Sequence, residues 1–394
     1  MFVPQGFQFA GVHCGIKQSS DIEDISLVVA PDGAVAAGTY TQNLIYAAPV
    51  AIDRERTPAT DIRVVVTNSG NANACTGQRG MEDAIRMTEL AGEACGVDPA
   101  RVLVMSTGII GEFLPMDKIA PGIQDAATQL ARDDEALYRA ARGILTTDTR
   151  HKVCTEEISV GGSTVRLAGF AKGAGMIGPR MATLLGVVTT DAQLAPDDAQ
   201  RILSQAVDKS FNCISVEGHM STNDTILLLA SGKAGQRLTG AALDSFAQSL
   251  EDTCIDLAKQ IPDDGEGATH LIEIEIVGCR TTANGQQIAK SIADSPLVKT
   301  AIAGGDPNWG RIVSAAGYAG VDFDASEVSL VVNDIELFSS GSPVPFDAAV
   351  ASDSIQKNRT TTIRLTVGSG PATARFWTSD LTVEYVRFNA EYHT

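Results

Sequence analysis

The sequence has no cluster of lysine or arginine and no long uninterrupted apolar run. Its 30 lysine and arginine residues are outnumbered by 48 aspartates and glutamates, which gives the 394-residue chain a formal net charge of −18 at pH 7. Proteins that follow a phosphate backbone or an anionic lipid surface carry clustered positive charge. No stretch approaches the roughly 18 apolar residues of a membrane span. The composition therefore predicts a folded, soluble protein with neither nucleic acid nor membrane as a partner.

Cysteine and histidine are scarce and scattered. The seven cysteines occur singly, without a C-x-x-C pair, and the five histidines show no spacing typical of metal ligands. This pattern indicates reduced thiols rather than disulfides or a zinc site, and it predicts no metal cofactor. The opening residues, MFVPQGFQFAGVHCG, lack the basic start and apolar core of a secretion signal, which predicts a cytoplasmic protein.

Strand-like and helix-like segments alternate along most of the chain. Short apolar runs are typical of strands covered on both faces, and they occur at 63–66, 101–105 and 226–230. LIEIEIV and TIRLTV instead alternate apolar and polar residues, as half-exposed strands do. Apolar spacing and end signals predict helices over 79–95, 117–142, 196–207 and 240–260. The pattern predicts an α/β fold built in layers.

The clearest turn-rich gap is GCRTTANGQQ at 278–287. Two strand-rich clusters follow it, at 328–338 and 361–388. We therefore expect two domains, a catalytic core over 1–280 and a smaller α/β domain over 281–394.

The stretch KGAGMIGPRMATLLGVVTTDA, 172–192, joins a glycine-rich turn to an apolar strand, with Thr183 between them. One interpretation is an ordinary turn in which Thr183 begins the strand. The other is a nucleophile, because a threonine that becomes the first residue of a chain can use its own α-amine as the base. That chemistry requires a cut between Ala182 and Thr183, and both interpretations stay open on residue types alone. Lys172 precedes the glycines instead of following them, which excludes a P-loop.

Three further turns allow a structural and a functional interpretation. MSTGIIGE, with Thr107 and Gly108, is either a polar turn or an oxyanion hole. NSGNANACTG is either a tight connection or a helix start near an anion. DDGEGAT is either a solvated loop or the position of a site carboxylate, Glu266, facing a substrate ammonium. Lys172 is likewise either a solvated lysine or a cation for a substrate carboxylate.

Taken together and in order, nine segments resemble the ornithine acetyltransferase family, also called glutamate N-acetyltransferase, of cyclic arginine biosynthesis. The segments are GFQFAGVHCGIK, NSGNANACTG, STGIIGE, TTDT, KGAGMIGPRMAT, STNDT, DGEGAT, VKTAIAGGDPNWGR and DLTVEYVRFNAEYHT. They extend from residue 6 to residue 394, so the resemblance covers nearly the whole chain.

The resemblance implies an αββα-type sandwich core with a smaller α/β C-terminal domain. It also implies self-cleavage between Ala182 and Thr183 into chains 1–182 and 183–394, which assemble as an α2β2 heterotetramer. Thr183 would be the nucleophile: it would accept the acetyl group from N-acetylornithine, and glutamate would then take that group from Thr183. Thr107 and Gly108 would form the oxyanion hole. The implied substrate contacts are Thr146, Lys172, Thr183, Glu266, Asn389 and Thr394, and the chemistry needs no metal or prosthetic group.

The chain departs from the family pattern at two places near the expected site. KGSGMIHPNMAT reads KGAGMIGPRMAT here, and DGDTSTND reads EGHMSTND; the differing residues are Ala174, Gly178, Arg180, Glu217, His219 and Met220. These changes leave the nucleophile and oxyanion donors intact and bear on which acceptor is used. The alternatives are a paralogous acetyltransferase with another amino-acid acceptor, an N-terminal-nucleophile amidase or aminopeptidase, and a binding protein that is never cut. Acetyl-CoA as a second donor stays open.

Overall fold

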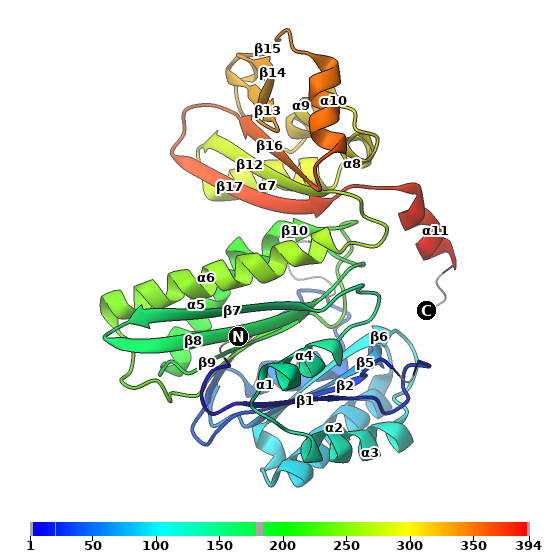
Figure 1. The fold of residues 1–394 in the computed structure, drawn as a ribbon, viewed down its shortest axis with the longest axis vertical. Coiled ribbons are helices and arrows are strands. Elements are labelled where there is room, and N and C mark those ends of the chain that lie inside the picture. Colours follow the sequence, from blue (N-terminus) through cyan, green and yellow to red (C-terminus); the bar gives the residue numbers. More distant parts are fainter. Residues whose placement is uncertain (1–2, 20, 179–183, 392–394) are drawn as a thin grey trace.

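The computed structural model describes residues 3–19, 21–178 and 184–391, and three β-sheets form its framework (Figure 1). The first sheet has the order β1-β2-β5-β6. Its strands are β1 (Gln8–Val12), β2 (Ile25–Val29), β5 (Val64–Asn71) and β6 (Val102–Ile109). β6 runs parallel to β5, whereas β1, β2 and β5 are antiparallel. The helices α1 (Ala48–Arg56), α2 (Gly77–Cys95) and α3 (Met116–Thr128) pack against this sheet.

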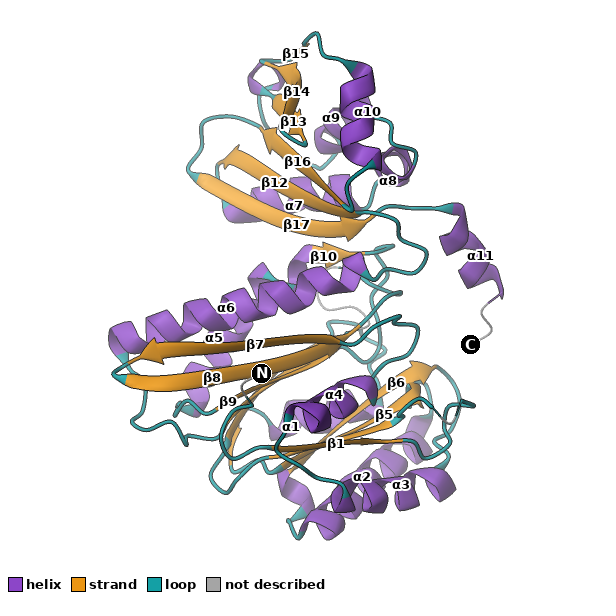
Figure 2. Cartoon of the chain, in the orientation of Figure 1, coloured by secondary structure: helices purple, strands orange, loops and turns teal. Residues whose placement is uncertain are grey.

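The second sheet has the order β4-β3-β11-β9-β8-β7. Its strands are β3 (Val35–Tyr40), β4 (Ala59–Thr60), β7 (Lys152–Val160), β8 (Ser163–Lys172), β9 (Leu185–Thr190) and β11 (Thr225–Ala230). The helices α5 (Pro196–Lys209) and α6 (Gly240–Asp263) cover its outer face (Figure 2).

One apolar core joins the facing sides of these two sheets. Phe9 and Val65 from the first sheet share it with Phe170, Val187 and Leu227 from the second. The helix α4 (Asp134–Arg142) contributes four buried residues to the same core, while α2 and α3 close a separate core on the far side of the first sheet. The predicted αββα-type sandwich is confirmed.

The third sheet has the order β10-β17-β12-β16-β13-β14-β15 and lies beyond α6 (Figure 1). Its strands are β10 (Ile214–Ser215), β12 (Leu271–Cys279), β13 (Ser329–Val332), β14 (Ile335–Ser339), β15 (Ser342–Pro343), β16 (Thr360–Thr366) and β17 (Ala372–Ser379). The helices of this part are α7 (Thr282–Ala293), α8 (Pro296–Ala303), α9 (Trp309–Gly317) and α10 (Ala348–Gln356). β12 pairs with β16 and β17, which both come later in the chain. The division at residues 280 and 281 stays a prediction.

Two predicted elements are wrong in extent. The helix expected over 117–142 is interrupted, because Ala131 pairs with Phe9 of β1 and Asp133 caps a new helix by accepting the Ala136 amide at 2.9 Å. The strand-rich cluster expected to reach 388 ends at Ser379, and α11 (Val383–Glu391) follows. The Thr382 hydroxyl accepts the Tyr385 amide at 3.3 Å, as a helix N-cap does.

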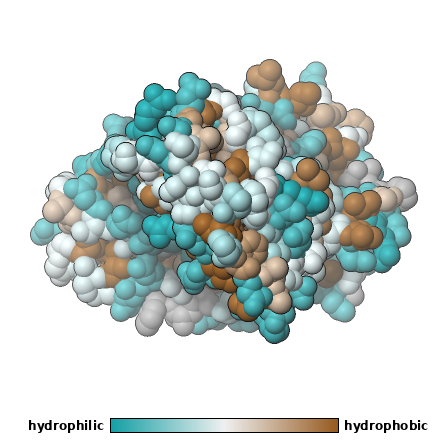
Figure 3. Space-filling view, turned by 90° about the horizontal axis from the view of Figure 1, so that it is seen from above, coloured by the Kyte–Doolittle hydropathy of each residue, from teal (hydrophilic) through white to brown (hydrophobic). Residues whose placement is uncertain are grey.

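Cysteines, helix hydropathy and surface composition can be compared with the sequence. All seven cysteines are free thiols. Within the described ranges, no helix is long and apolar enough to cross a membrane. Seen from the end that carries the third sheet, the surface mixes hydrophilic and hydrophobic side chains in small groups (Figure 3). Such mixing is ordinary for a protein surface.

Candidate functional site

A cavity where β6 and β8 end brings together predicted site residues from distant parts of the sequence. The predicted residues that line it are Thr107, Gly108, Thr146, Lys172, Glu266 and Asn389. They come from the end of β6, the loop after α4, the end of β8, the loop after α6, and α11. Ala182, Thr183 and Thr394 lie outside the described residues.

The backbone at Thr107 and Gly108 is irregular. The parallel pairing of β5 with β6 shifts its register where Gly70 and Asn71 meet these residues. Gly108 has a φ of +137°, and a Cβ atom there would clash with the backbone of Gly70. Only glycine fits this position. At such an irregular strand end, backbone N–H groups point away from the hydrogen bonds of the sheet. They can then donate to a ligand, as an oxyanion hole requires.

Lys172 is a buried cation beside this strand end. Its Nζ donates to Thr146 Oγ1 at 2.6 Å and to Thr107 Oγ1 at 3.3 Å. Burial lowers the pKa of Lys172, and the Asp148 carboxylate acts in the opposite direction. The lysine therefore joins two predicted site threonines, and its positive charge faces the cavity that they line.

A buried ion-pair network supports Lys172 and was not predicted from the sequence. Lys152 Nζ lies 2.6 Å from Asp148 Oδ1 and 2.7 Å from Asp264 Oδ2. Asp148 also accepts the amides of Thr146, at 3.2 Å, and of Gly173, at 2.7 Å. Burial acts to raise the pKa of Asp148, but Lys152, Lys172 and the hydrogen bond from the Gly173 amide lower it to about 2. Asp148 thus fixes the backbone next to Lys172 and beneath Thr146.

Glu266 and Asn389 form the acidic side of the cavity. Asn389 Nδ2 donates to Glu266 Oε2 at 3.0 Å, although 123 residues separate them. The Glu266 amide donates to Ala174 O at 2.9 Å, which ties this loop to the glycine-rich segment. A Cβ atom at Gly175 would clash with the Glu266 carboxyl. The carboxylate is therefore held against a position that has no side chain.

Gly175→Ala is expected to lower the acetyl transfer that the family resemblance implies about tenfold, chiefly through a higher KM, because the new methyl group displaces the Glu266 carboxyl from the cavity. Steady-state kinetics measure this. Gly317→Ala is the matched control, since a Cβ atom at the end of α9 meets no atom within 4 Å. Unchanged kinetics in Gly175→Ala, or an equal loss in Gly317→Ala, would contradict the prediction.

Asn223 is a further residue of the cavity whose role was not predicted from the sequence. It lines the cavity and is buried. Its Nδ2 donates to Ala72 O at 2.6 Å and to Ser106 O at 2.8 Å. Asn223 therefore fixes the backbone directly before Thr107. STNDT carried the signal, since it is one of the matching segments, but its partners lie more than 100 residues away.

Two further motifs contain residues that make structural contacts. Asn73 of NSGNANACTG donates to Gly80 O at 2.8 Å, which holds the start of α2. Trp309 of GGDPNWGR stacks on Phe338 with ring centroids 5.2 Å apart, as a packing anchor does. Across the described part of the chain, no group of three or more His, Cys, Asp or Glu residues could hold a metal ion.

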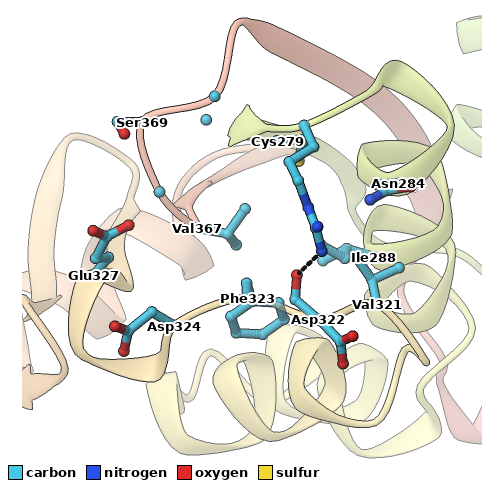
Figure 4. A pocket seen from close by; sticks show the side chains of 14 residues that line it. Cys279, Asn284, Ile288, Val321, Asp322, Phe323, Asp324, Glu327, Val367 and Ser369 are labelled. Carbon is cyan, nitrogen blue, oxygen red and sulfur yellow. Dashed lines mark hydrogen bonds between the residues drawn. The ribbon is translucent and has the colours of Figure 1, made fainter.

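A larger cavity of about 620 Å³ lies in the third sheet, away from the predicted residues (Figure 4). Its walls carry Arg280, Asp322 and Glu327 around an apolar floor that includes Val367. Arg280 Nη2 donates to the backbone carbonyl of Asp322 at 3.3 Å. None of the predicted site residues lines this cavity, so its size does not make it the candidate site.

The chain is similar to known proteins over its whole length. A family model described as the ArgJ family matches residues 8–394. "Arginine biosynthesis bifunctional protein ArgJ" of Rhodopirellula baltica is 47% identical, with 100% of this chain and 96% of that protein covered. The protein of the same name from Symbiobacterium thermophilum is 44% identical over 99% and 98%. A crystal structure of ArgJ from Bacillus halodurans is 38% identical with a TM-score of 0.51, covering 52% of this chain and 97% of that chain.

Proposed function

Because this chain belongs to the ArgJ family, we propose that it moves an acetyl group from N2-acetyl-L-ornithine to L-glutamate through an acetyl-Thr183 intermediate. It is an acetyltransferase of arginine biosynthesis that acts on small molecules. One observation carries the residue assignment: a single cavity holds the irregular Thr107–Gly108 strand end, a buried lysine and the Glu266–Asn389 pair.

Self-cleavage between Ala182 and Thr183 is the first part of the proposal. The Bacillus halodurans chain is matched over nearly its full length by about half of this chain. Such a match is expected if the Bacillus halodurans protein is cut into two chains of similar length and one of them is compared. It therefore supports cleavage of this chain near its middle. Cleavage would free the Thr183 α-amine, and an N-terminal amine is the base that a threonine hydroxyl needs.

Acetyl transfer would then proceed in two balanced steps. The Thr183 hydroxyl attacks the acetyl carbonyl of N-acetylornithine, its proton passes through the α-amine to the leaving nitrogen, and ornithine departs. The amine of glutamate then attacks the acetyl ester, and Thr183 regains its proton as N-acetylglutamate leaves. In both steps the Thr107 hydroxyl and the Gly108 amide would stabilise the oxyanion. Such donors each contribute about 3 kcal/mol in other enzymes.

The charges around the cavity suit both substrates. N-acetylornithine and glutamate share an α-carboxylate, and we assign it to Lys172. The side-chain ammonium of ornithine would face Glu266, while the amide of Asn389 can donate to the side-chain carboxylate of glutamate. Thr146, Thr183 and Thr394 complete the proposed contacts. No step requires a metal or a prosthetic group.

Isotope exchange tests the two-step reaction. Labelled ornithine should enter N-acetylornithine in the absence of glutamate, because the acetyl-enzyme forms before the acceptor binds. An amidase or aminopeptidase would instead release ornithine steadily without any acceptor. The lack of both exchange and release would refute the proposed intermediate.

The donor and acceptor range is tested separately. The relatives are named bifunctional, and we propose that the second activity uses acetyl-CoA as a donor to glutamate. Formation of N-acetylglutamate from acetyl-CoA and glutamate alone would establish it. Gly178, Arg180, His219 and Met220 depart from the family pattern, so other amino acids should be compared as acceptors in the same assay.

Sedimentation of the purified protein tests the proposed α2β2 assembly, and imaging of a tagged chain tests the proposed cytoplasmic location.

A further inference from the structure

Residues 216–225, here called the clamp loop, bind the chain directly before the expected cleavage segment. Glu217 Oε1 accepts the amide of Ile177 at 2.6 Å. In return, the Ile177 carbonyl accepts the amides of Val216 and Gly218, both at 2.9 Å. Three hydrogen bonds therefore fix Ile177, five residues before Ala182.

The same loop binds the chain directly after that segment. Asp224 Oδ1 accepts the amide of Leu184 at 2.9 Å, and the Leu184 carbonyl accepts the Thr225 amide at 3.1 Å. Asp224 is fully buried. Leu184 is covalently joined to Thr183, so Asp224 fixes the residue next to the proposed nucleophile.

A close approach of two glycines completes the contact on the first side. A Cβ atom at Gly178 would lie 2.6 Å from the carbonyl carbon of Gly218, whose own φ is +82°. A side chain at 178 would therefore push the segment away from the clamp loop.

The two carboxyl groups share a further property. Among the described residues, Glu217 Oε2 and Asp224 Oδ2 are buried without a hydrogen-bond partner. Burial raises the pKa of each group to about 8. A buried carboxyl with one oxygen left without a partner is costly for stability. Their places on either side of the same segment indicate a role in chain cleavage.

We propose that Glu217 and Asp224 are positioning residues for self-cleavage, holding the chain on both sides of the Ala182–Thr183 bond. This inference rests on the self-cleavage proposed above. The two residues then differ in what they do after the cut. Glu217 binds the end of chain 1–182, whereas Asp224 continues to hold the start of chain 183–394 in every round of acetyl transfer.

The test follows the uncut fraction of freshly translated full-length chain by denaturing electrophoresis and intact mass. Glu217→Ala and Asp224→Ala are expected to be cut about tenfold more slowly, because the backbone amide loses its acceptor. Glu217→Gln and Asp224→Asn keep an acceptor oxygen and should be cut at nearly the parent rate. Once fully cut, Asp224→Ala should stay below the parent in kcat/KM, because the Leu184 amide next to Thr183 has lost its acceptor.

Asp53 provides a matched control. It is buried, its Oδ1 accepts the Val104 amide at 2.9 Å, and its Oδ2 lacks a partner among the described residues, but its hydrogen bond joins α1 to β6 and not to the clamp loop. Asp53→Ala should be less stable to heat and still be cut at the parent rate. Parent-rate cutting in both alanine variants of the clamp loop, or equally slow cutting in Asp53→Ala, would overturn the inference.

A second variant covers the case in which the alanine variants do not fold. Gly178→Ala leaves both carboxyls in place and disturbs only the contact with Gly218, so it should also be cut more slowly. Parent-rate cutting in Gly178→Ala would then overturn the inference. If the parent protein itself remains one chain of 394 residues, the proposed self-cleavage fails, which is a separate result.

Discussion

Thr183→Ala is expected to leave the protein as one 394-residue chain that transfers no measurable acetyl group. The substitution removes the hydroxyl needed both to cut the chain and to form the acetyl-enzyme. Loss of a covalent nucleophile lowers kcat by at least about 10⁴-fold in other enzymes. Intact mass reports the cut, and exchange of labelled ornithine into N-acetylornithine reports the chemistry.

Thr183→Ser separates loss of the nucleophile from general damage. Serine keeps the hydroxyl, so this variant should still be cut and should transfer acetyl groups more slowly than the parent. Thr189→Ala is a control for the loss of a hydroxyl elsewhere, because Thr189 is buried in β9 and donates to Ala168 O at 2.9 Å. It should be cut normally. Acetyl transfer by Thr183→Ala would disprove the proposed intermediate.

The fold was predictable from the sequence where the information is local. The helices over 79–95 and 240–260 are correct within three residues because an apolar stripe at helical spacing depends only on neighbouring residues. The interruption near 131 was not predictable in this way. It depends on the pairing of Ala131 with Phe9, which are distant in sequence. The helix α11 was missed because VEYV alternates like a strand.

The candidate site shows the same division. Short motifs identified Thr107, Lys172 and Glu266, since each lies within a segment that matches the family pattern. The ion pair of Lys152 with Asp264 was not predictable in this way, because Lys152 lies in no matching segment and is 112 residues from Asp264, the first residue of DGEGAT. Only the folded chain brings the two together. The sequence therefore predicted the groups proposed to touch substrate better than those that hold them in place.

Lys172→Met is expected to lower kcat/KM for N-acetylornithine about 100-fold, because a charged hydrogen bond to the substrate carboxylate contributes about 3 kcal/mol. The side chain is similar in length and suits a buried position, so packing changes little. The pH profile gives a second readout. Burial lowers the pKa of Lys172, so the parent should lose activity on the alkaline side below the pH of about 10.4 at which a free lysine titrates.

The sign of this pH effect follows from the charge. A protonated Lys172 attracts the carboxylate, and activity falls as rising pH removes the proton; Lys172→Met should be slow throughout and lack this alkaline loss. Lys299→Met is the matched control, because Lys299 is also buried, with a pKa lowered to about 8, but donates to Thr378 in the third sheet. It should keep the alkaline loss. If Lys299→Met lost it and Lys172→Met kept it, the assignment of the substrate carboxylate to Lys172 would be wrong.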